Sequence, residues 1–150
     1  MKLVIQRVKH ASCTIDNKIT GQIEKGYMVL VGFGEGDNEE VVEKLANKLA
    51  KLRIFEDNQE KMNLSIYDVE GEILSISQFT LYADSKKGNR PSFVNALEPN
   101  KASKLYDYFN EYLRSLNLKV ETGIFGADMK IELLNDGPVT IIMDSKELLW

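Results

Sequence analysis

The chain has 150 residues, of which 43% are hydrophobic and 28% are charged, and its 19 basic and 23 acidic side chains give a net charge of −4. This composition is typical of a globular domain, excludes a disordered or fibrous chain, and argues against a protein that coats nucleic acid through bulk positive charge. The single Cys13 excludes an internal disulfide framework, and the single His10 excludes a histidine-rich metal site within one chain.

Apolar stretches are short throughout the sequence. The longest, residues 27–31, has five residues, whereas a membrane-spanning helix needs about 20. No apolar segment follows the basic start at Lys2, as a secretory signal would require. We therefore expect a cytoplasmic protein with no membrane segment, no bound metal and no cofactor.

The first half of the chain predicts two strands and a helix. Residues 2–15 are rich in β-branched residues and predict a long strand, which a turn at residues 16–18 reverses. Residues 27–33 do not alternate, which is typical of a strand buried on both faces. Asp37 is a candidate helix cap with Glu40 in the capping-box position. The helix that follows presents an apolar stripe of Val42, Leu45, Leu49 and Leu52.

The second half predicts a strand over residues 72–84 and a second helix from Pro99 onward. The apolar stripe of that helix consists of Ala102, Leu105, Phe109, Tyr112 and Leu116. Three short strands follow at residues 118–122, 128–134 and 139–144. Since strands outnumber helices, residues 1–150 predict one mixed α/β domain whose sheet curves around one or two helices.

Two segments stand out as candidate functional sites. In the predicted strand, alternation places Ser77 and Phe79 on one face and Gln78 and Thr80 on the other, where an amide and a hydroxyl would bind a carbonyl or an oxyanion. The same pattern is typical of an ordinary strand with one polar face. The second segment, Asn-Asp-Gly-Pro-Val-Thr at residues 135–140, by itself predicts a turn between two strands.

A cluster of positive charge follows the first segment. Lys86, Lys87 and Arg90 lie within five residues of one another. Charge alone leaves two interpretations open, a solvated surface loop or a contact with nucleic acid.

Taken in order along the chain, Ser-Gln-Phe-Thr-Leu and Asn-x-Gly-Pro-Val-Thr resemble the D-aminoacyl-tRNA deacylases. The resemblance extends through most of the sequence. Further matching segments are residues 6–8, 52–57, 61–63, 90–93 and 125–129. It implies a mixed α+β fold with a curved, mostly antiparallel, barrel-like sheet and two main helices.

The resemblance also implies an activity and an assembly. Members of the family hydrolyse the ester between a D-amino acid and the terminal adenosine of tRNA, and they are homodimers with active sites at the subunit interface. The Gly137–Pro138 peptide would be cis and would enter the partner subunit's site. There its backbone oxygens would bind the α-amino group and leave no room for an L side chain. Glycine has no side chain to exclude, so we expect some hydrolysis of glycyl-tRNA.

Residue roles follow from the same resemblance. Ser77, Gln78, Phe79 and Thr80 would form the catalytic segment, with Gln78 and neighbouring N–H groups at the ester carbonyl and Phe79 near the adenosine. Arg7 and Met129 would support the Gly137–Pro138 loop, and the aminoacyl-tRNA acceptor end would pass the Lys86, Lys87 and Arg90 cluster. Asn89 stands where relatives often have a second arginine, which weakens this cluster by one charge.

The chemistry leaves alternatives open. Thr80 has no evident base to activate it as a nucleophile, so we expect an ordered water to attack with help from the ribose 2′-hydroxyl. The rivals are a Thr80-dependent esterase of small substrates and a non-catalytic RNA-binding module. An exposed Trp150 at the C-terminus would suit a dimer contact.

Overall fold

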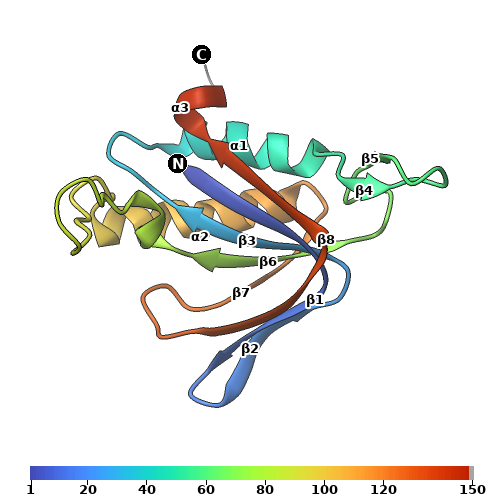
Figure 1. Cartoon of the computed structure of the whole chain (residues 1–150), viewed down its shortest axis with the longest axis horizontal. Coiled ribbons are helices and arrows are strands. Elements are labelled where there is room, and N and C mark those ends of the chain that lie inside the picture. Colours follow the sequence, from blue (N-terminus) through green and yellow to red (C-terminus); the bar gives the residue numbers. More distant parts are fainter. Residues whose placement is uncertain (149–150) are drawn as a thin grey trace.

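A computed structural model describes residues 1–148, so Trp150 lies outside the described residues. Strands dominate, and the helices lie together on one side of the sheet (Figure 1). In chain order the elements are β1 (Lys2–Ile15), β2 (Lys18–Ile23), β3 (Gly26–Gly32), α1 (Glu39–Lys51), β4 (Phe55–Glu56), β5 (Met62–Leu64), β6 (Glu72–Ser77), the 3₁₀ helix η1 (Phe79–Tyr82), α2 (Pro99–Ser115), β7 (Lys119–Thr122), β8 (Lys130–Asp144) and α3 (Ser145–Leu148). No helix within residues 1–148 is long and apolar enough to cross a membrane.

The main sheet has the strand order β2-β1-β3-β6-β7, and β8 pairs with β1. β1 runs antiparallel to β2, β3 and β8, whereas β3, β6 and β7 are parallel to one another. The two ends of the sheet approach at β2 and β7, where a Cβ on Gly21 would lie 2.7 Å from the Thr122 carbonyl oxygen. The predicted mixed α+β, barrel-like fold with two main helices is confirmed.

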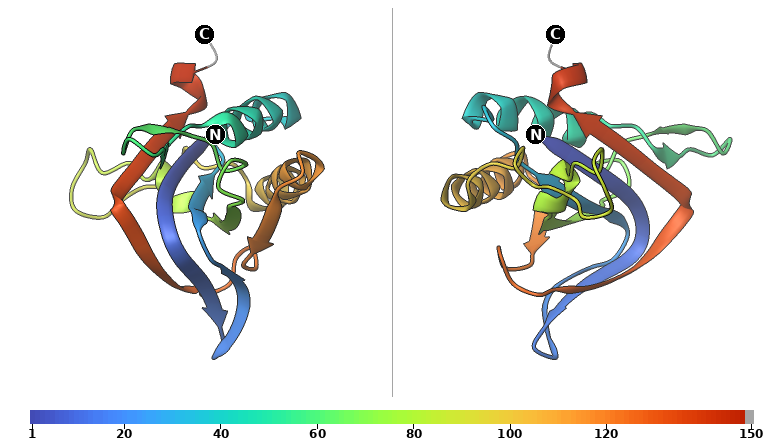
Figure 2. Two further views of the ribbon diagram at one scale, coloured as in Figure 1. Left: turned by 90° about the vertical axis from the view of Figure 1, so that its right-hand side faces the viewer. Right: turned by 60° about the vertical axis from the view of Figure 1, so that its left-hand side comes forward.

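Apolar side chains form two clusters on opposite faces of this curved sheet. Helices α1 and α2 cover one face of the sheet, and the sheet curves around its other face (Figure 2). The larger cluster joins sheet residues to those helices, and the smaller is built from strand residues such as Val8, Cys13 and Leu74. β3 contributes Val29 to the first cluster and Met28 to the second. The expectation of a strand buried on both faces is thus confirmed.

Both predicted helices form, with a change at the first cap. Asn38, not Asp37, caps α1, because its side-chain oxygen accepts from the Val41 amide at 3.1 Å. The Asp37 carboxylate instead accepts from the Gly34 amide at 2.7 Å and closes the preceding turn. Pro99 begins α2 as expected, although its most deeply buried residues include Tyr106 and Leu113, outside the predicted stripe.

The strand predicted over residues 72–84 ends early, and the alternation inferred for residues 77–81 is wrong. β6 stops at Ser77, and the Gln78 amide makes the last rung by donating to the Val31 carbonyl at 2.7 Å. The neighbouring strand β3 ends at Gly32. Without a partner strand, the chain turns into η1 through the bond from the Leu81 amide to the Gln78 carbonyl at 3.3 Å.

The two strands predicted at residues 128–134 and 139–144 are one continuous strand, β8. The segment between them is therefore not a hairpin turn. Gln6 pairs with Thr140 and Val8 pairs with Asn135, so residues 136–139 bulge out opposite Arg7 alone. β1 continues past the bulge as a template on both sides, which is why the chain resumes pairing instead of reversing.

Candidate active site

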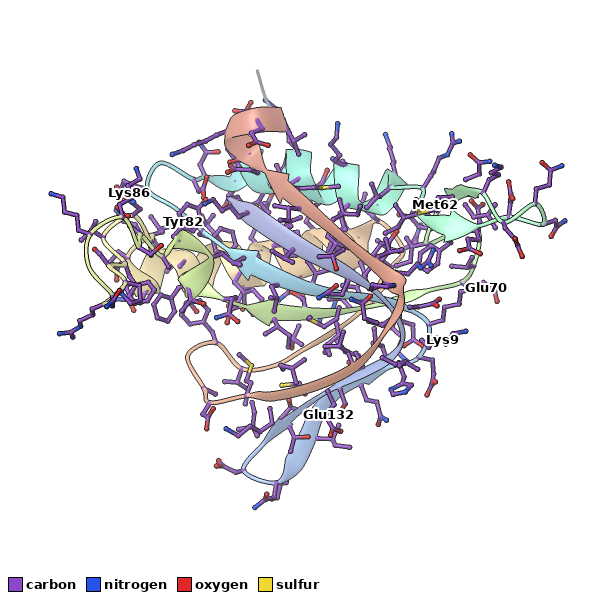
Figure 3. The ribbon with its side chains drawn as sticks, in the orientation of Figure 1. Lys9, Met62, Glu70, Tyr82, Lys86 and Glu132 are labelled. Carbon is purple, nitrogen blue, oxygen red and sulfur yellow. The ribbon has the colours of Figure 1, made fainter. Side chains whose placement is uncertain are left out.

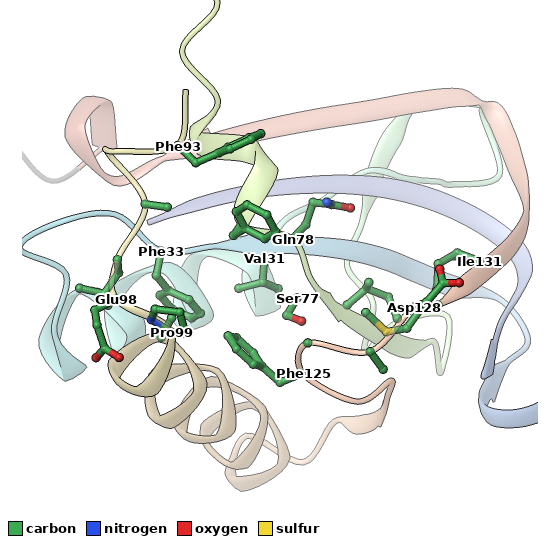
Figure 4. Close-up of a pocket in the computed structure, with 18 residues that line it drawn as sticks. Val31, Phe33, Ser77, Gln78, Phe93, Glu98, Pro99, Phe125, Asp128 and Ile131 are labelled. Carbon is green, nitrogen blue, oxygen red and sulfur yellow. The ribbon is translucent and has the colours of Figure 1, made fainter. Parts of the chain in front are cut away.

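A cavity of about 590 Å³ lies where β6 ends and η1 begins. Three of the predicted catalytic residues, Ser77, Gln78 and Phe79, line it together with Met129. Ser77 and Phe125 lie toward the middle of the cavity, between Glu98 and Pro99 at one end and Asp128 and Ile131 at the other (Figure 4). One chain thus brings these four predicted site residues into a single cavity.

Thr80 is placed differently. It is not among the residues that line this cavity in the described chain. Its hydroxyl oxygen accepts a hydrogen bond from the Gln78 side-chain amide. That contact orients the Gln78 amide and supplies no proton acceptor to activate Thr80.

The backbone at the start of η1 carries free donors. The Gln78 N–H is used by Val31, but the N–H groups of Phe79 and Thr80 open the 3₁₀ helix and have no acceptor within residues 1–148. The first N–H groups of any helix lack intrahelical partners. Phe79 lines the cavity and Thr80 follows it directly, so these are adjacent free donors of the kind that stabilise a developing oxyanion.

Aromatic rings form one side of the cavity mouth. Phe79 and Phe93 meet edge to face with their ring centroids 5.1 Å apart. Their exposed fractions, 57% and 36%, are high for rings of this size. Deeper in, the walls are apolar and include Leu97, Ala102 and Phe125. This combination suits a planar heterocycle that stacks at the mouth and an apolar body inside.

The charged side chains that line the cavity are both acidic. Glu98 stands at the start of α2 and accepts from the Asn100 amide at 2.8 Å and from the Lys101 amide at 3.1 Å. These backbone hydrogen bonds, the one from Asn100 foremost, hold the pKa of Glu98 below its usual value. Asp128 is the second acidic residue of the lining. Glu98 therefore stays ionised at neutral pH and gives this end of the cavity negative charge.

The Gly137–Pro138 segment lies elsewhere, on the bulge of β8. Both residues are exposed, and the peptide bond between them is cis. Arg7, only 4% exposed, holds the base of this loop by donating to the Asp136 carbonyl at 3.0 Å. Its guanidinium also donates to the Ile54 carbonyl at 2.7 Å. Arg7 thus supports the loop within this chain, whereas Met129 lines the cavity.

The basic cluster occupies the exposed loop after η1. The loop is closed at its base by two backbone hydrogen bonds between Asp84 and Ser92, at 2.7 and 2.8 Å. Lys86 lies at the opposite end of the molecule from Met62 of β5 (Figure 3). The loop connects Phe79 of η1 to Phe93 along the chain, although none of its three cations lines the cavity in the described residues.

Sequence reasoning missed several parts of the lining. Phe93 falls in a segment that matched the family, yet nothing in its local pattern assigns it to the cavity. The same holds for Phe125, which lies in the matching segment 125–129 but has no local pattern that assigns it to the cavity. Glu98 stands directly before Pro99 and carries the signal of a helix start, although acidic caps are too common to indicate a site.

Comparisons with known proteins identify the family of this chain. The family described as D-Tyr-tRNA(Tyr) deacylase matches residues 4–144. A D-aminoacyl-tRNA deacylase from Lactobacillus delbrueckii subsp. bulgaricus is 60% identical over 144 residues, covering 96% of this chain and 99% of that protein. Another from Lactobacillus gasseri is 56% identical with the same coverage.

Two solved structures share the fold. One, titled c-Myc DNA Unwinding Element Binding Protein, has a TM-score of 0.90 and 39% identity, covering 96% of this chain and 98% of that one. The other, a probable eukaryotic D-amino acid tRNA deacylase, has a TM-score of 0.82 at 18% identity, covering 95% and 97%. With a family match over nearly its whole length, the chain belongs to the D-Tyr-tRNA(Tyr) deacylase family and is a hydrolase of D-aminoacyl-tRNA.

Proposed function

We propose that this hydrolase works as a homodimer in which the cavity of one subunit is completed by the Gly137–Pro138 loop of the other. The observation that carries the proposal is that these two parts lie far apart within one chain. The loop stands beside Arg7 and the β4 segment, whereas the cavity lies at the end of β6.

Strand register measures the separation. Val31 pairs with both Leu3 and Ser77. Arg7 pairs with Tyr27, four residues back along β3, an offset of about 13 Å at about 3.3 Å per residue. Strands β8, β1, β3 and β6 lie side by side in that order, and three spacings of about 4.8 Å add about 14 Å. Measured along the sheet, the loop and the end of β6 are thus roughly 20 Å apart in one chain.

The outer strand supports a partner at this surface. β8 is an edge strand of 15 residues that pairs with β1 alone among the described strands. Along it, Ile142 is 71% exposed and Leu134 is 49% exposed. Long edge strands with exposed apolar side chains are normally covered by another element or chain. A second copy docked here would bury these side chains and bring its loop toward the cavity.

The reaction requires only an ordered water. Water attacks the ester carbonyl carbon and forms a tetrahedral oxyanion. The free N–H groups of Phe79 and Thr80 stabilise this oxyanion together with the side-chain amide of Gln78. The vicinal 2′-hydroxyl assists by taking up the water proton as it passes its own to the departing 3′-oxygen. The carbon–oxygen bond then breaks, which releases the D-amino acid and tRNA with a free 3′-hydroxyl. Protein groups position the reactants and form no covalent intermediate.

Chirality is read at the loop. Backbone carbonyl oxygens of the loop accept hydrogen bonds from the α-ammonium group, which leaves an L side chain pointing into protein. Gly137 has no Cβ and allows the substrate to come close to the backbone. Glycine carries no side chain to exclude, so glycyl-tRNA should also be hydrolysed.

The acceptor end of tRNA is expected along the basic loop. Lys86, Lys87 and Arg90 are exposed on the loop that connects Phe79 to Phe93, and base stacking on such rings contributes about 1–3 kcal/mol. With a net charge of −4, the chain should bind tRNA modestly and with strong salt dependence. The cytoplasmic location stays a prediction.

The deciding experiment compares D-tyrosyl-tRNA, L-tyrosyl-tRNA and glycyl-tRNA at equal enzyme concentration. We expect rapid loss of the D ester, slower loss of the glycyl ester and no enzymatic loss of the L ester. Equal stability of all three esters with a well-folded protein would favour a nucleic-acid-binding module, the role named for the c-Myc DNA Unwinding Element Binding Protein. Cleavage of simple esters without tRNA would favour the small-substrate esterase.

A further inference from the structure

Asn135 and Thr140 flank the β8 bulge and form its neck. A side chain that has no role in the scheme above, that of Gln6, bridges the two. Gln6 and Arg7 are neighbours on β1 and therefore point to opposite faces of the sheet. Arg7 binds the base of the loop from one face. Gln6 meets the loop from the other, because it pairs with Thr140 just after the bulge.

A single oxygen atom joins the two sides of this neck. Gln6 Oε1 accepts from the Asn135 side-chain amide at 2.7 Å and also from the Thr140 hydroxyl. Asn135 stands on one side of residues 136–139 and Thr140 on the other. The Asn135 side-chain oxygen in turn accepts from the Val139 amide at 3.2 Å. An amide oxygen has two lone pairs, so Gln6 Oε1 is fully used.

We infer that Gln6 is a positioning residue for the Gly137–Pro138 loop, and this rests on the function proposed for that loop. Gly137 and Pro138 are exposed, so side-chain packing within the chain does little to set their direction. The direction of the loop is set instead by the distance between Asn135 and Thr140 at the neck. Gln6 fixes that distance by holding Asn135 and Thr140 together, and this assigns a purpose to both polar ends of the Asn-x-Gly-Pro-Val-Thr segment.

Two substitutions separate the acceptor from the rest of the side chain. Gln6→Met keeps the length and removes the acceptor, whereas Gln6→Glu keeps an oxygen that accepts both bonds. At the usual net strength of two hydrogen bonds, Gln6→Met should lower kcat/KM for D-tyrosyl-tRNA about ten- to a hundredfold. Gln6→Glu should restore most of it. The matched control is Gln22→Met, which removes an exposed glutamine from β2 and should change neither rate nor stability.

Amide hydrogen exchange at Val139 reports the neck directly, whether or not the enzyme turns over. We expect faster exchange in Gln6→Met and near-wild-type exchange in Gln6→Glu, with melting temperatures recorded for each. The inference would be overturned if Gln6→Met kept the wild-type turnover and the wild-type exchange rate at Val139. It would also be overturned if Gln6→Met and Gln6→Glu lost equal amounts of turnover. If Gln6→Met does not fold, Thr140→Val removes one donor to the same oxygen and should raise Val139 exchange; unchanged exchange would again overturn it.

The failure of this inference is distinguishable from failure of the proposed function. If the wild-type protein shows no D-specific hydrolysis, the proposed function is refuted. Exchange at Val139 would still test whether Gln6 holds Asn135 and Thr140 together. If the wild-type enzyme is selective for the D ester and the Gln6→Met variant matches it in rate and exchange, only the role of Gln6 is refuted.

Discussion

A variant damaged in the loop and a variant damaged in the cavity should rescue each other when they share a dimer. The loop variant is Gly137→Ala. A Cβ at this position would lie 2.9 Å from a Val139 methyl group and 3.0 Å from an Arg7 guanidinium nitrogen, at a φ of +128°. An L residue with positive φ costs about 1–2 kcal/mol. Displacing Arg7 from its bond to the Asp136 carbonyl adds about 1 kcal/mol.

The sum, about 2–3 kcal/mol, corresponds to a loss of about 30- to 150-fold in correctly formed loop. The cavity variant is Gln78→Ala, which removes a donor near the oxyanion and should cost about a hundredfold. In a mixed dimer, one of the two sites combines the intact cavity of the loop variant with the intact loop of the cavity variant. Random pairing makes half of the dimers mixed, so activity should return to about a quarter of the wild-type value.

The assay uses two differently tagged chains, expressed together and purified through both tags in succession. Initial rates on D-tyrosyl-tRNA are compared with those of each variant alone. Tandem purification removes the unmixed dimers, so the purified mixed dimer should then reach about half of the wild-type rate. If the loop served the cavity of its own chain, every site would carry one lesion. No recovery in a stable mixed dimer would therefore refute the cross-subunit arrangement.

The remaining predictions test the chemistry, the tRNA contact and the fold. Because water is the nucleophile, Thr80→Ala should keep most of its turnover and lose only what depends on the hydrogen bond that orients the Gln78 side-chain amide; an acyl-enzyme trapped on wild-type Thr80 by mass spectrometry would contradict this. Replacing the three cations of residues 86–90 by alanine should flatten the slope of log affinity against log salt by about 2, measured with uncharged tRNA, and an unchanged slope would exclude this contact. Tyr106→Phe leaves the buried Ser75 carbonyl without its donor at 2.6 Å and should lower the free energy of unfolding by about 1–3 kcal/mol in urea titrations. The pKa of Glu98 in the folded protein is lowered from 4.5. The ionised carboxylate therefore stabilises the folded state fully above pH 4.5, and this contribution is lost as the pH falls below that value. The difference in urea midpoint between wild type and Glu98→Gln should shrink as the pH falls from 7 to 3.

The parts of the fold that local pattern determines were predictable from the sequence. Both long helices follow from apolar spacing, and the two-faced burial of β3 follows from its unbroken apolar run. The end of β6 could not be found in this way, because residues 78–84 have ordinary strand composition. That end coincides with the end of β3, whose last residue, Gly32, comes 45 residues before Ser77 in the chain.

The site shows the same division. Pattern and resemblance located residues 77–79 and Met129, which do meet in one cavity. Asn-Asp-Gly-Pro has the composition of a turn, and only the pairing of β1 on both sides of it reveals a bulge. Phe93 and Phe125 reach the cavity from loops whose paths depend on tertiary packing, so no local signal identifies them.

The early end of β6 also bears on how such a chain can change in length. The free N–H groups of Phe79 and Thr80 exist because no strand continues beside them: β3 ends at Gly32, the Phe33 carbonyl accepts from the Leu97 amide at 3.0 Å, and β7 ends at Thr122. An insertion that extended β3 past Gly32 would place a free strand carbonyl opposite Thr80 and draw the start of η1 into the sheet. The exposed loop at residues 85–91, closed at its base by Asp84 and Ser92, is free of that constraint. Insertions in the loop should therefore leave the free N–H groups in place, whereas insertions at the β3 terminus should remove them.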